Sequence, residues 1–211
     1  MEAFKKETVI TFESQAKEYE SYLHEILEKF AQDDVERFVS SLQGPRILDV
    51  GCGPGVFLEA FRNQGLDGMG IDLSDVFIQR CHEKGLNAKR MDIEHPILYP
   101  HSFHGIWGNT ALHHMPKEKA FAVIQHFSRL LMGNGILFLT LPDGQGEGYE
   151  DTPREGFKQW VAYYTLEDVR LMMGKHFDEL HYSSKTLPDG KNYHAFLFRV
   201  KPFHSPAYRN F

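Results

Sequence analysis

The 211-residue sequence predicts a doubly wound α/β fold, in which helices cover both faces of a mostly parallel sheet of seven strands. The first observation is that short apolar runs alternate with helical patterns between residues 46 and 141. The second is Gly135–Leu141, the most hydrophobic run, which is expected at the sheet centre. The third is Pro188-Asp189-Gly190, which favours a tight turn and makes the last two strands an antiparallel hairpin.

The first 45 residues are expected to form a helical cap. Apolar residues at helical spacing predict two helices within residues 14–42, separated near Gln32. Asp33 or Asp34 could serve as the N-cap of the second helix. Gly44 and Pro45 then favour a turn before the first strand.

Residues 46–200 are expected to form the main domain. Its strands are predicted at Arg46–Val50, Gly68–Ile71, Ala88–Met91, Phe103–Gly108, Gly135–Leu141, Phe177–Thr186 and Asn192–Lys201. The helices that follow are capped by Ser74 and Thr165, one ends at Gly85, and Pro54 suits a first helical turn. Residues 142–165 lack a clear period and are a candidate lid, and residues 201–211 form a tail.

The composition is that of an ordinary globular protein and excludes several classes. A net charge of −6 argues against binding nucleic acid or anionic membranes through bulk electrostatics. Two cysteines cannot make a disulfide framework. No apolar run approaches the ~18 residues of a membrane span, and no signal peptide is visible. We therefore expect a cytoplasmic protein without a membrane anchor.

A glycine-rich turn, Gly51-Cys52-Gly53-Pro54-Gly55, lies between the first core strand and the first core helix. Glycines at this place let a ligand approach the backbone and the free N–H groups of the helix. A phosphate-binding loop would require Gly-Lys-Ser/Thr, and Gly55-Val56-Phe57 lacks it. A dinucleotide fingerprint would require a third glycine where Val56 stands, so a nicotinamide oxidoreductase is disfavoured.

Two acidic residues follow the next strands. Asp72 comes 21 residues after Gly51, a separation that suits hydrogen bonds to ribose hydroxyls. Asp92 follows the third strand and would lie near an adenine edge. From spacing alone, a capping role for Asp72 and a turn-forming role for Asp92 explain the residues about equally well.

Four segments carry a family resemblance: Ile47–Phe61 (ILDVGCGPGVFLEAF), Met69–Ser74 (MGIDLS), Met91–Ile93 (MDI) and Gly105–Pro116 (GIWGNTALHHMP). Together they resemble the class I S-adenosylmethionine-dependent methyltransferases, in particular the small-molecule "type 11" branch, over roughly residues 14–200. This resemblance implies a Rossmann-like fold whose seven-stranded sheet ends in the hairpin predicted above.

The resemblance also implies a set of cofactor-binding residues. In the glycine turn, which extends to Gly55, Gly51, Cys52 and Gly53 would line the methionine and ribose part of S-adenosylmethionine, with Asp49 acting on its amino group directly or through water. Asp72 would bind the ribose hydroxyls and Leu73 would pack on the adenine. The remaining implied contacts are Asp92 and Ile93 at the adenine, Asn109 at the methionine moiety and Tyr19 over the carboxylate.

His113 and His114 follow the fourth strand, near where an acceptor would enter. A histidine there has the pKa range of a general base, although alignment alone can suffice for methyl transfer from a sulfonium. The alternative is that both histidines only shape the loop. No histidine or cysteine spacing suggests a metal site, and neither Cys52 nor Cys81 has an evident partner for nucleophilic chemistry.

The acceptor is expected to be a small molecule. The aromatic residues Phe157, Trp160, Tyr163 and Tyr164 could cover such a ligand or could simply pack on the sheet. Asn109-Thr110-Ala111-Leu112 departs from the Asn/Asp-Pro-Pro-Tyr/Phe motif of amino-methylating relatives that act on nucleic acid. We expect S-adenosylhomocysteine as product and no nucleic-acid or membrane partner, and a homodimer is possible. The alternative function is a binding protein of the same fold that holds the cofactor without turnover.

Overall fold

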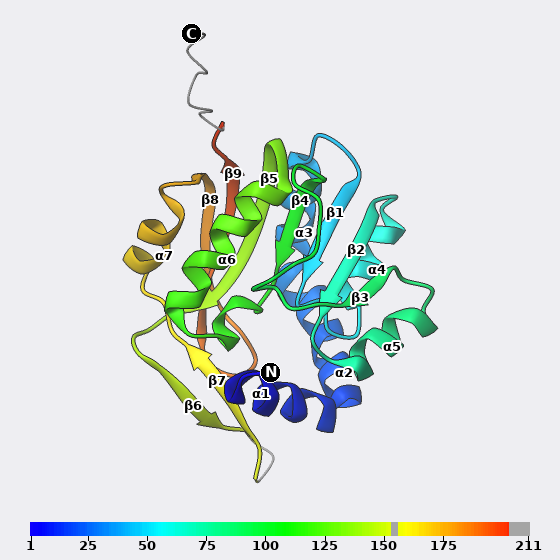
Figure 1. Cartoon of the computed structure of the whole chain (residues 1–211), viewed down its shortest axis with the longest axis vertical. Coiled ribbons are helices and arrows are strands. Elements are labelled where there is room, and N and C mark those ends of the chain that lie inside the picture. Colours follow the sequence, from blue (N-terminus) through cyan, green and yellow to red (C-terminus); the bar gives the residue numbers. More distant parts are fainter. Residues whose placement is uncertain (153–155, 203–211) are drawn as a thin grey trace, which may run out of the picture.

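The computed structural model describes residues 1–152 and 156–202, and a seven-stranded sheet organises them (Figure 1). The strand order is β3-β2-β1-β4-β5-β9-β8. The strands are β1 (Arg46–Val50), β2 (Asp67–Asp72), β3 (Ala88–Arg90), β4 (Phe103–Gly108), β5 (Leu131–Pro142), β8 (Phe177–Thr186) and β9 (Asn192–Val200). The predicted fold class is confirmed.

The sheet is parallel from β3 to β5 and antiparallel beyond. The β8–β9 hairpin pairs Thr186 with Asn192 around the predicted Pro-Asp-Gly turn. Within the sheet, the expected place of one strand shifts. The fully buried run Ile136–Leu141 lies in β5, one strand away from the middle strand β4.

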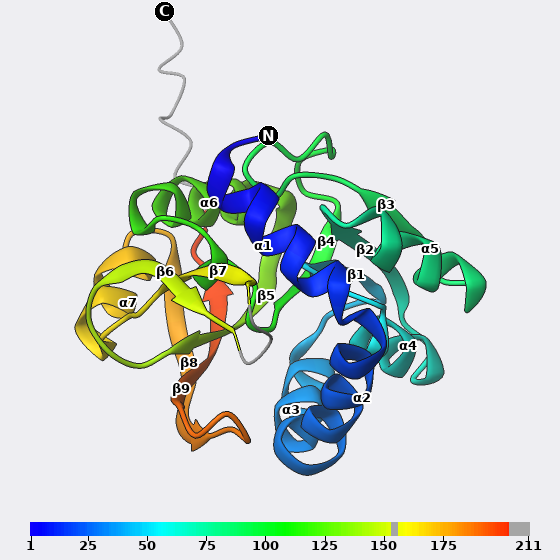
Figure 2. The same ribbon diagram turned by 90° about the horizontal axis from the view of Figure 1, so that it is seen from below.

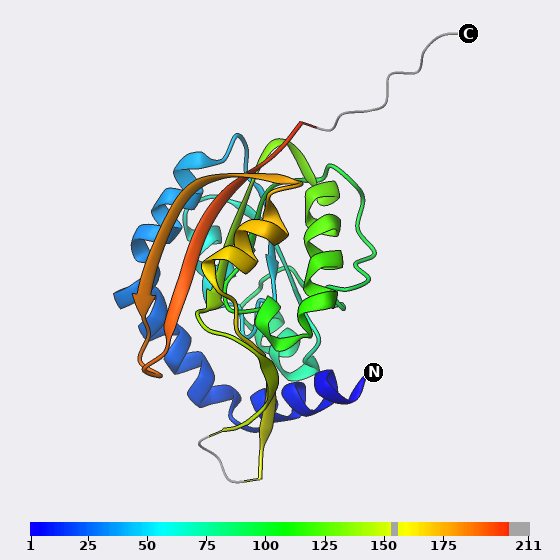
Figure 3. The ribbon, with the colours of Figure 1, turned by 90° about the vertical axis from the view of Figure 1, so that its left-hand side faces the viewer.

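Helices cover both faces of the sheet, as Figure 3 shows from its β8–β9 edge. On one face, α2 (Ala16–Ile26), α3 (Gln32–Ser41) and α4 (Val56–Asn63) pack on Trp107 and Phe138, whose rings stack at 3.9 Å. Helix α5 (Asp75–Glu83) packs beside α4. On the other face, α6 (Lys117–Leu130) and α7 (Leu166–Met173) close the larger core cluster. Burial on both faces is why these strands read as continuous apolar runs.

The N-terminal region differs from the expected two helices. A helix α1 (Ala3–Ser14) precedes them, and a π-helical turn (Leu27–Ala31) joins α2 to α3 without a loop. The N-cap of α3 is Ala31, so neither Asp33 nor Asp34 caps it. Asp34, itself buried, instead forms an ion pair with the half-buried Lys185 of β8. The expected break was wrong because the helical backbone continues through it.

The predicted helix caps are largely confirmed. The Ser74 hydroxyl accepts the Phe77 N–H, and Thr165 forms a capping box with Asp168. Pro54 is an exception, because α4 begins at Val56 with Gly55 as its N-cap. Within the described parts of the chain, no helix is both long and apolar enough to cross a membrane.

Residues 142–165, which show no clear period in the sequence, contain a second small sheet. Its strands β6 (Glu147–Asp151) and β7 (Lys158–Ala162) pair antiparallel, with Tyr149 opposite Trp160. Helix α1 lies against β7: the Thr11 hydroxyl donates to the Lys158 carbonyl at 2.6 Å, and the Trp160 N–H donates to Thr8 at 3.1 Å. Figure 2 shows α1 and this hairpin lying across one end of the main sheet. The tail from residue 203 lies outside the described residues.

Candidate functional site

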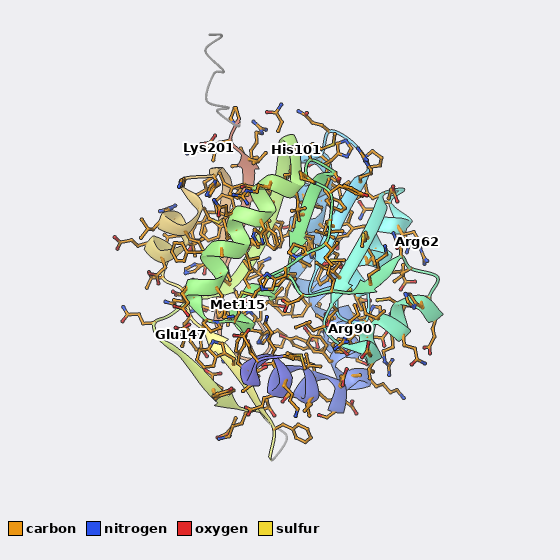
Figure 4. All side chains as sticks on the ribbon, in the orientation of Figure 1. Arg62, Arg90, His101, Met115, Glu147 and Lys201 are labelled. Atoms are coloured by element: carbon orange, nitrogen blue, oxygen red, sulfur yellow. The ribbon has the colours of Figure 1, made fainter. Side chains whose placement is uncertain are left out.

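A pocket lies where the carboxyl ends of β1 to β4 meet α1. It holds about 770 Å³ of empty space, part of it open to solvent, which is within the range of cofactor sites. Figure 4 labels Met115 and Arg90, which lie toward the α1 end of the sheet, and Met115 lines the pocket. Ligands in doubly wound sheets bind at this end, and the pocket is therefore the candidate site.

The glycine turn forms one wall. Gly51 and Gly53 have φ values of 66° and 52°, in the left-handed region that glycine tolerates. A Cβ on Gly51 would lie 2.7 Å from the Cβ of Ala111, so a larger residue could not fit between the two loops. The Gly51 and Cys52 N–H groups donate to the Ile71 carbonyl, and the Gly53 N–H donates to Asp72 Oδ2 at 2.9 Å. The turn is thus tied to the end of β2.

Asp49 and Asp72 place two carboxyl groups beside this turn. Asp72 lines the pocket and also accepts the Ser74 N–H at 2.9 Å. Burial raises the pKa of Asp72, partly opposed by its backbone hydrogen bonds. Asp49 is 3% exposed, and burial together with the Asp72 charge raises the pKa of Asp49 to about 8. Its Oδ2 is buried without a hydrogen-bond partner among the described residues. An unpaired carboxyl group of this kind suits the amino group of a ligand.

Asp92 lines the pocket together with Leu73 and Ile93, as the resemblance implies. Its carboxylate is already engaged, because Lys5 Nζ of α1 lies 2.6 Å from Asp92 Oδ2 and 2.6 Å from a Glu94 oxygen. Burial would raise the pKa of Asp92, but the hydrogen bond from Lys5 lowers it overall. Lys5 is a pocket residue that the sequence reasoning missed.

Tyr19 also lines the pocket, where it stacks on Phe77 of α5 at 5.7 Å and contacts Phe12 of α1 at 4.7 Å. Burial, with the nearby Asp72 charge, raises the pKa of Tyr19, so its hydroxyl stays protonated. The aromatic wall formed by Phe12, Tyr19 and Phe77 extends the site beyond the implied residues. Phe12 was missed because the sequence did not predict α1.

Four implied cofactor residues, the buried Asp49 among them, lie behind the pocket wall rather than in it. The Cys52 side chain lies 2.7 Å from the position of a Cβ on Gly70, and Gly55 packs on Cys81 and Leu86. Asn109 Oδ1 accepts a hydrogen bond from the Thr140 hydroxyl, and Thr110 and Ala111 line the pocket in its stead. These residues support the turn and the loop after β4.

His114 lies between this pocket and a second one, whose lining also includes His113. Its Nδ1 is 3.0 Å from the Trp160 carbonyl oxygen. A carbonyl only accepts, so Nδ1 carries the hydrogen and Nε2 carries the lone pair. Burial lowers the pKa of His114 to about 4, and burial followed by the neighbouring His114 lowers the pKa of His113 well below its usual value. Both imidazoles are therefore neutral at pH 7.

Among the described residues, no three side chains of His, Cys, Asp or Glu gather in a way that could hold a metal ion. The residues present fit an adenosine-type cofactor instead. The glycine turn allows a close approach to the backbone, Asp72 offers a carboxylate at the end of β2, and Asp49 offers an unpaired one.

Comparisons with known proteins agree with this geometry. The family model described as "Methyltransferase domain" matches residues 20–178. Among curated proteins, the chain is 32% identical over 108 residues to the ubiquinone biosynthesis O-methyltransferase of Methylococcus capsulatus, a match that covers 48% of this chain and 45% of the relative. The chain therefore spans about half the length of the curated relatives it matches.

Solved structures share the fold at lower identity. An S-adenosylmethionine-dependent methyltransferase of Methanosarcina mazei is 18% identical with a TM-score of 0.69, covering 76% of this chain and 95% of the other. A Burkholderia thailandensis N1-methyltransferase, solved with 1,6-didemethyltoxoflavin and S-adenosylhomocysteine, is 17% identical with a TM-score of 0.70, covering 96% and 92%.

Proposed function

The chain belongs to the methyltransferase-domain family, and on that basis we propose that it transfers a methyl group from S-adenosylmethionine to a small-molecule acceptor. The observation that carries the proposal is the glycine turn with its two strand-end carboxyl groups, Asp49 and Asp72. Residues 46–200 then serve as the cofactor-binding domain, residues 1–45 as the cap, and residues 142–165 as part of the acceptor side.

The cofactor contacts follow from the pocket. Asp72 accepts hydrogen bonds from the ribose hydroxyls, while Leu73 and Ile93 pack on the adenine. Asp49 meets the amino group directly or through water, since its Oδ2 needs a partner. Asp92 can receive the adenine amine while it keeps Lys5, because a carboxylate offers about four lone-pair sites. Asn109 acts on the methionine moiety through the Thr110 loop that it anchors.

We propose a hydroxyl oxygen as the acceptor atom, which the O-methyltransferase names of the curated relatives support. S-adenosylmethionine supplies a methyl group activated by the sulfonium, whose sulfur keeps the carbon–sulfur electron pair and leaves as S-adenosylhomocysteine. The acceptor oxygen forms the new bond to carbon with its own lone pair. Its proton passes to the neutral Nε2 of His114, which lies at the junction of the two pockets, and then to water.

His113 has a supporting role in this scheme. Its ring lies 3.9 Å from that of His114, and both residues belong to a single 3₁₀ turn (Leu112–His114). The bond from His114 to the Trp160 carbonyl fixes the tautomer, so that the base depends on β7 as well as on the loop after β4. Alignment of the acceptor supplies most of the remaining rate enhancement.

The test is a turnover screen over a library of hydroxylated metabolites, read as release of S-adenosylhomocysteine. Asp72→Ala should weaken cofactor binding by about 1.5–3 kcal/mol, the scale of lost charge-assisted hydrogen bonds. Asp72→Asn separates the two roles of this side chain, because the amide oxygen can still accept the Gly53 N–H. An unchanged dissociation constant for Asp72→Ala would remove Asp72 from the site.

A further inference from the structure

The second pocket opens directly from the cofactor pocket. The two share Phe12, Tyr19, Thr110 and His114 as lining residues. His114 is the proposed proton acceptor, and the second pocket is therefore where the body of the acceptor must lie while its oxygen meets the methyl group. The residues that line this pocket therefore indicate the chemistry of the acceptor.

Two properties of the lining stand out. Its walls are aromatic, with Phe12, Tyr22 and Tyr193 facing the space. Its charged side chains are Glu18 of α2 and Asp189 of the β8–β9 turn, and the described residues of the lining include no lysine or arginine. Aromatic faces and carboxylates both attract cations, and together they repel anions.

Lys191 is a nearby cation whose charge contributes, after burial, to the low pKa of His113 and His114, but it is paired rather than free. Its ammonium lies 2.7 Å from Glu150 and 2.5 Å from the Tyr163 hydroxyl, so it is already paired. The Asp189 charge reaches the pocket walls. Burial, followed by Asp189 and Glu25, raises the pKa of Tyr22 to about 12, and burial and Asp189 also raise the pKa of Tyr193. Both phenols stay neutral, and Tyr193 donates its hydrogen to Asp189 at 2.8 Å.

His113 provides independent evidence that this pocket holds a ligand. It lines the pocket, is 5% exposed, and its Nδ1 is buried without a hydrogen-bond partner within the described part of the chain. Such a nitrogen is costly unless a bound group or a water satisfies it. Glu18 and Asp189 are exposed, so they form the rim of the pocket while His113 lies at its depth.

We infer that the acceptor carries a protonated amine at the end remote from its methylated oxygen, held at the rim by Glu18 and Asp189 against Tyr22 and Tyr193. This inference rests on the proposed function and adds a substrate class to it, that of planar hydroxylated amines. An acceptor whose remote end is a carboxylate would meet two like charges and no cation in the described lining.

Three catechols that differ in the charge of one side arm test the inference: dopamine is cationic, ethylcatechol is neutral and dihydroxyphenylacetate is anionic. For each we would measure kcat/KM for methylation, and the dissociation constant with the protein loaded with S-adenosylhomocysteine. Dopamine should exceed ethylcatechol by roughly fivefold, the scale of a rim ion pair, and dihydroxyphenylacetate should be poorest.

The variants Glu18→Gln and Asp189→Asn should each reduce the preference for dopamine over ethylcatechol, and the double variant should abolish it. Asp67→Asn is the matched control, because it removes the same charge at the opposite end of the sheet, where β2 begins. A preference that is absent, reversed or unchanged in the double variant would overturn the inference.

The same titrations distinguish this inference from the function on which it rests. If S-adenosylhomocysteine binds but none of the catechols does, the amine-bearing acceptor is wrong and the cofactor site stands. If S-adenosylhomocysteine itself does not bind, the proposed function fails and the inference falls with it.

Discussion

At the scale of single residues, Asp49 is the most unusual group beside the cofactor pocket. Its pKa of about 8 means that it is largely protonated at pH 7 before a ligand binds. The amino group of S-adenosylmethionine is a cation that favours the ionised carboxylate. Binding should therefore release roughly 0.9 proton at pH 7, a fraction that follows from a pKa one unit above the pH.

Calorimetric titration in two buffers of different ionisation enthalpy measures this release. Asp49→Asn should bind the cofactor more weakly and release no proton from this site. Because binding requires Asp49 to ionise, the affinity for the cofactor should rise with pH up to about pH 8, where ionising Asp49 requires less free energy. A wild-type protein that binds without proton release would place Asp49 outside the amino-group contact.

His114 makes a second prediction at this scale. Because the pKa of His114 is about 4, its Nε2 stays unprotonated well below neutrality. With S-adenosylmethionine saturating at each pH, kcat/KM for the acceptor should therefore hold from pH 7 down to about pH 5 and fall only as the pH approaches 4. An acid limb near pH 6.5 would indicate a base with an ordinary histidine pKa.

Substitution of His114 tests its proposed role as a base independently of the pH profile. His114→Gln should lower kcat by about 10²-fold, the lower range for a general base, with little change in cofactor affinity. His24→Gln on the exposed face of α2 is the matched control. Full activity of His114→Gln would mean that alignment suffices and that the histidines only shape the loop.

At the scale of elements, α1 closes the pocket from outside the main domain. Lys5 bonds Asp92 and Glu94, the Ser74 hydroxyl donates to Glu13, and Thr8 and Thr11 bond β7. Lys5 is 7% exposed and Glu94 8%, so this ion pair is buried. Removing one partner of a buried pair leaves the other charge uncompensated.

Lys5→Met should therefore lower the free energy of unfolding by about 1–3 kcal/mol, less than for an isolated pair because Lys119 still contacts Glu94 at 2.9 Å. Hydrogen exchange should show α1 losing protection before the sheet does. Lys6→Met, on the exposed side of the same helix, should change neither quantity. Adding Glu94→Gln to Lys5→Met should recover part of the lost free energy of unfolding. Equal protection of α1 in Lys5→Met and Lys6→Met would contradict this account.

Helix α1 also shows which parts of the structure could not be predicted from the sequence. The core strands were found because buried strands read as apolar runs that end at glycine or aspartate, which also located Gly51, Asp72 and Asp92. Helix α1 was missed because its sequence AFKKETVITFES mixes charges with β-branched residues and has a weak apolar stripe. Its buried Lys5 depends on Asp92, which lies 87 residues away. The sequences of β6 (EGYED) and β7 (KQWVA) likewise show no clear alternation of apolar and polar residues.

At the scale of the whole molecule, the pocket joins the N-terminal cap to the ends of the parallel strands. Residues from α1, the β1 turn, β2 and the loop after β4 all line it. A ligand that contacts them together binds only the folded arrangement, and it stabilises that arrangement by mass action. The net charge of −6 does not oppose this, since in the proposed complex the cationic amino group of the cofactor meets Asp49.

The prediction for the whole molecule concerns the shift in Tm that S-adenosylhomocysteine or NAD produces in thermal unfolding. At a hundredfold excess of S-adenosylhomocysteine over its dissociation constant, stability should rise by about 2.7 kcal/mol. For a chain of this size, that corresponds to a rise in Tm of roughly 5–10 °C. NAD should give no comparable rise, because Val56 stands where a dinucleotide fingerprint needs glycine. Asp72→Ala should reduce the rise with S-adenosylhomocysteine, which excludes a nonspecific effect of the ligand. A protein whose Tm rises with NAD and not with S-adenosylhomocysteine would be a different kind of enzyme on the same fold.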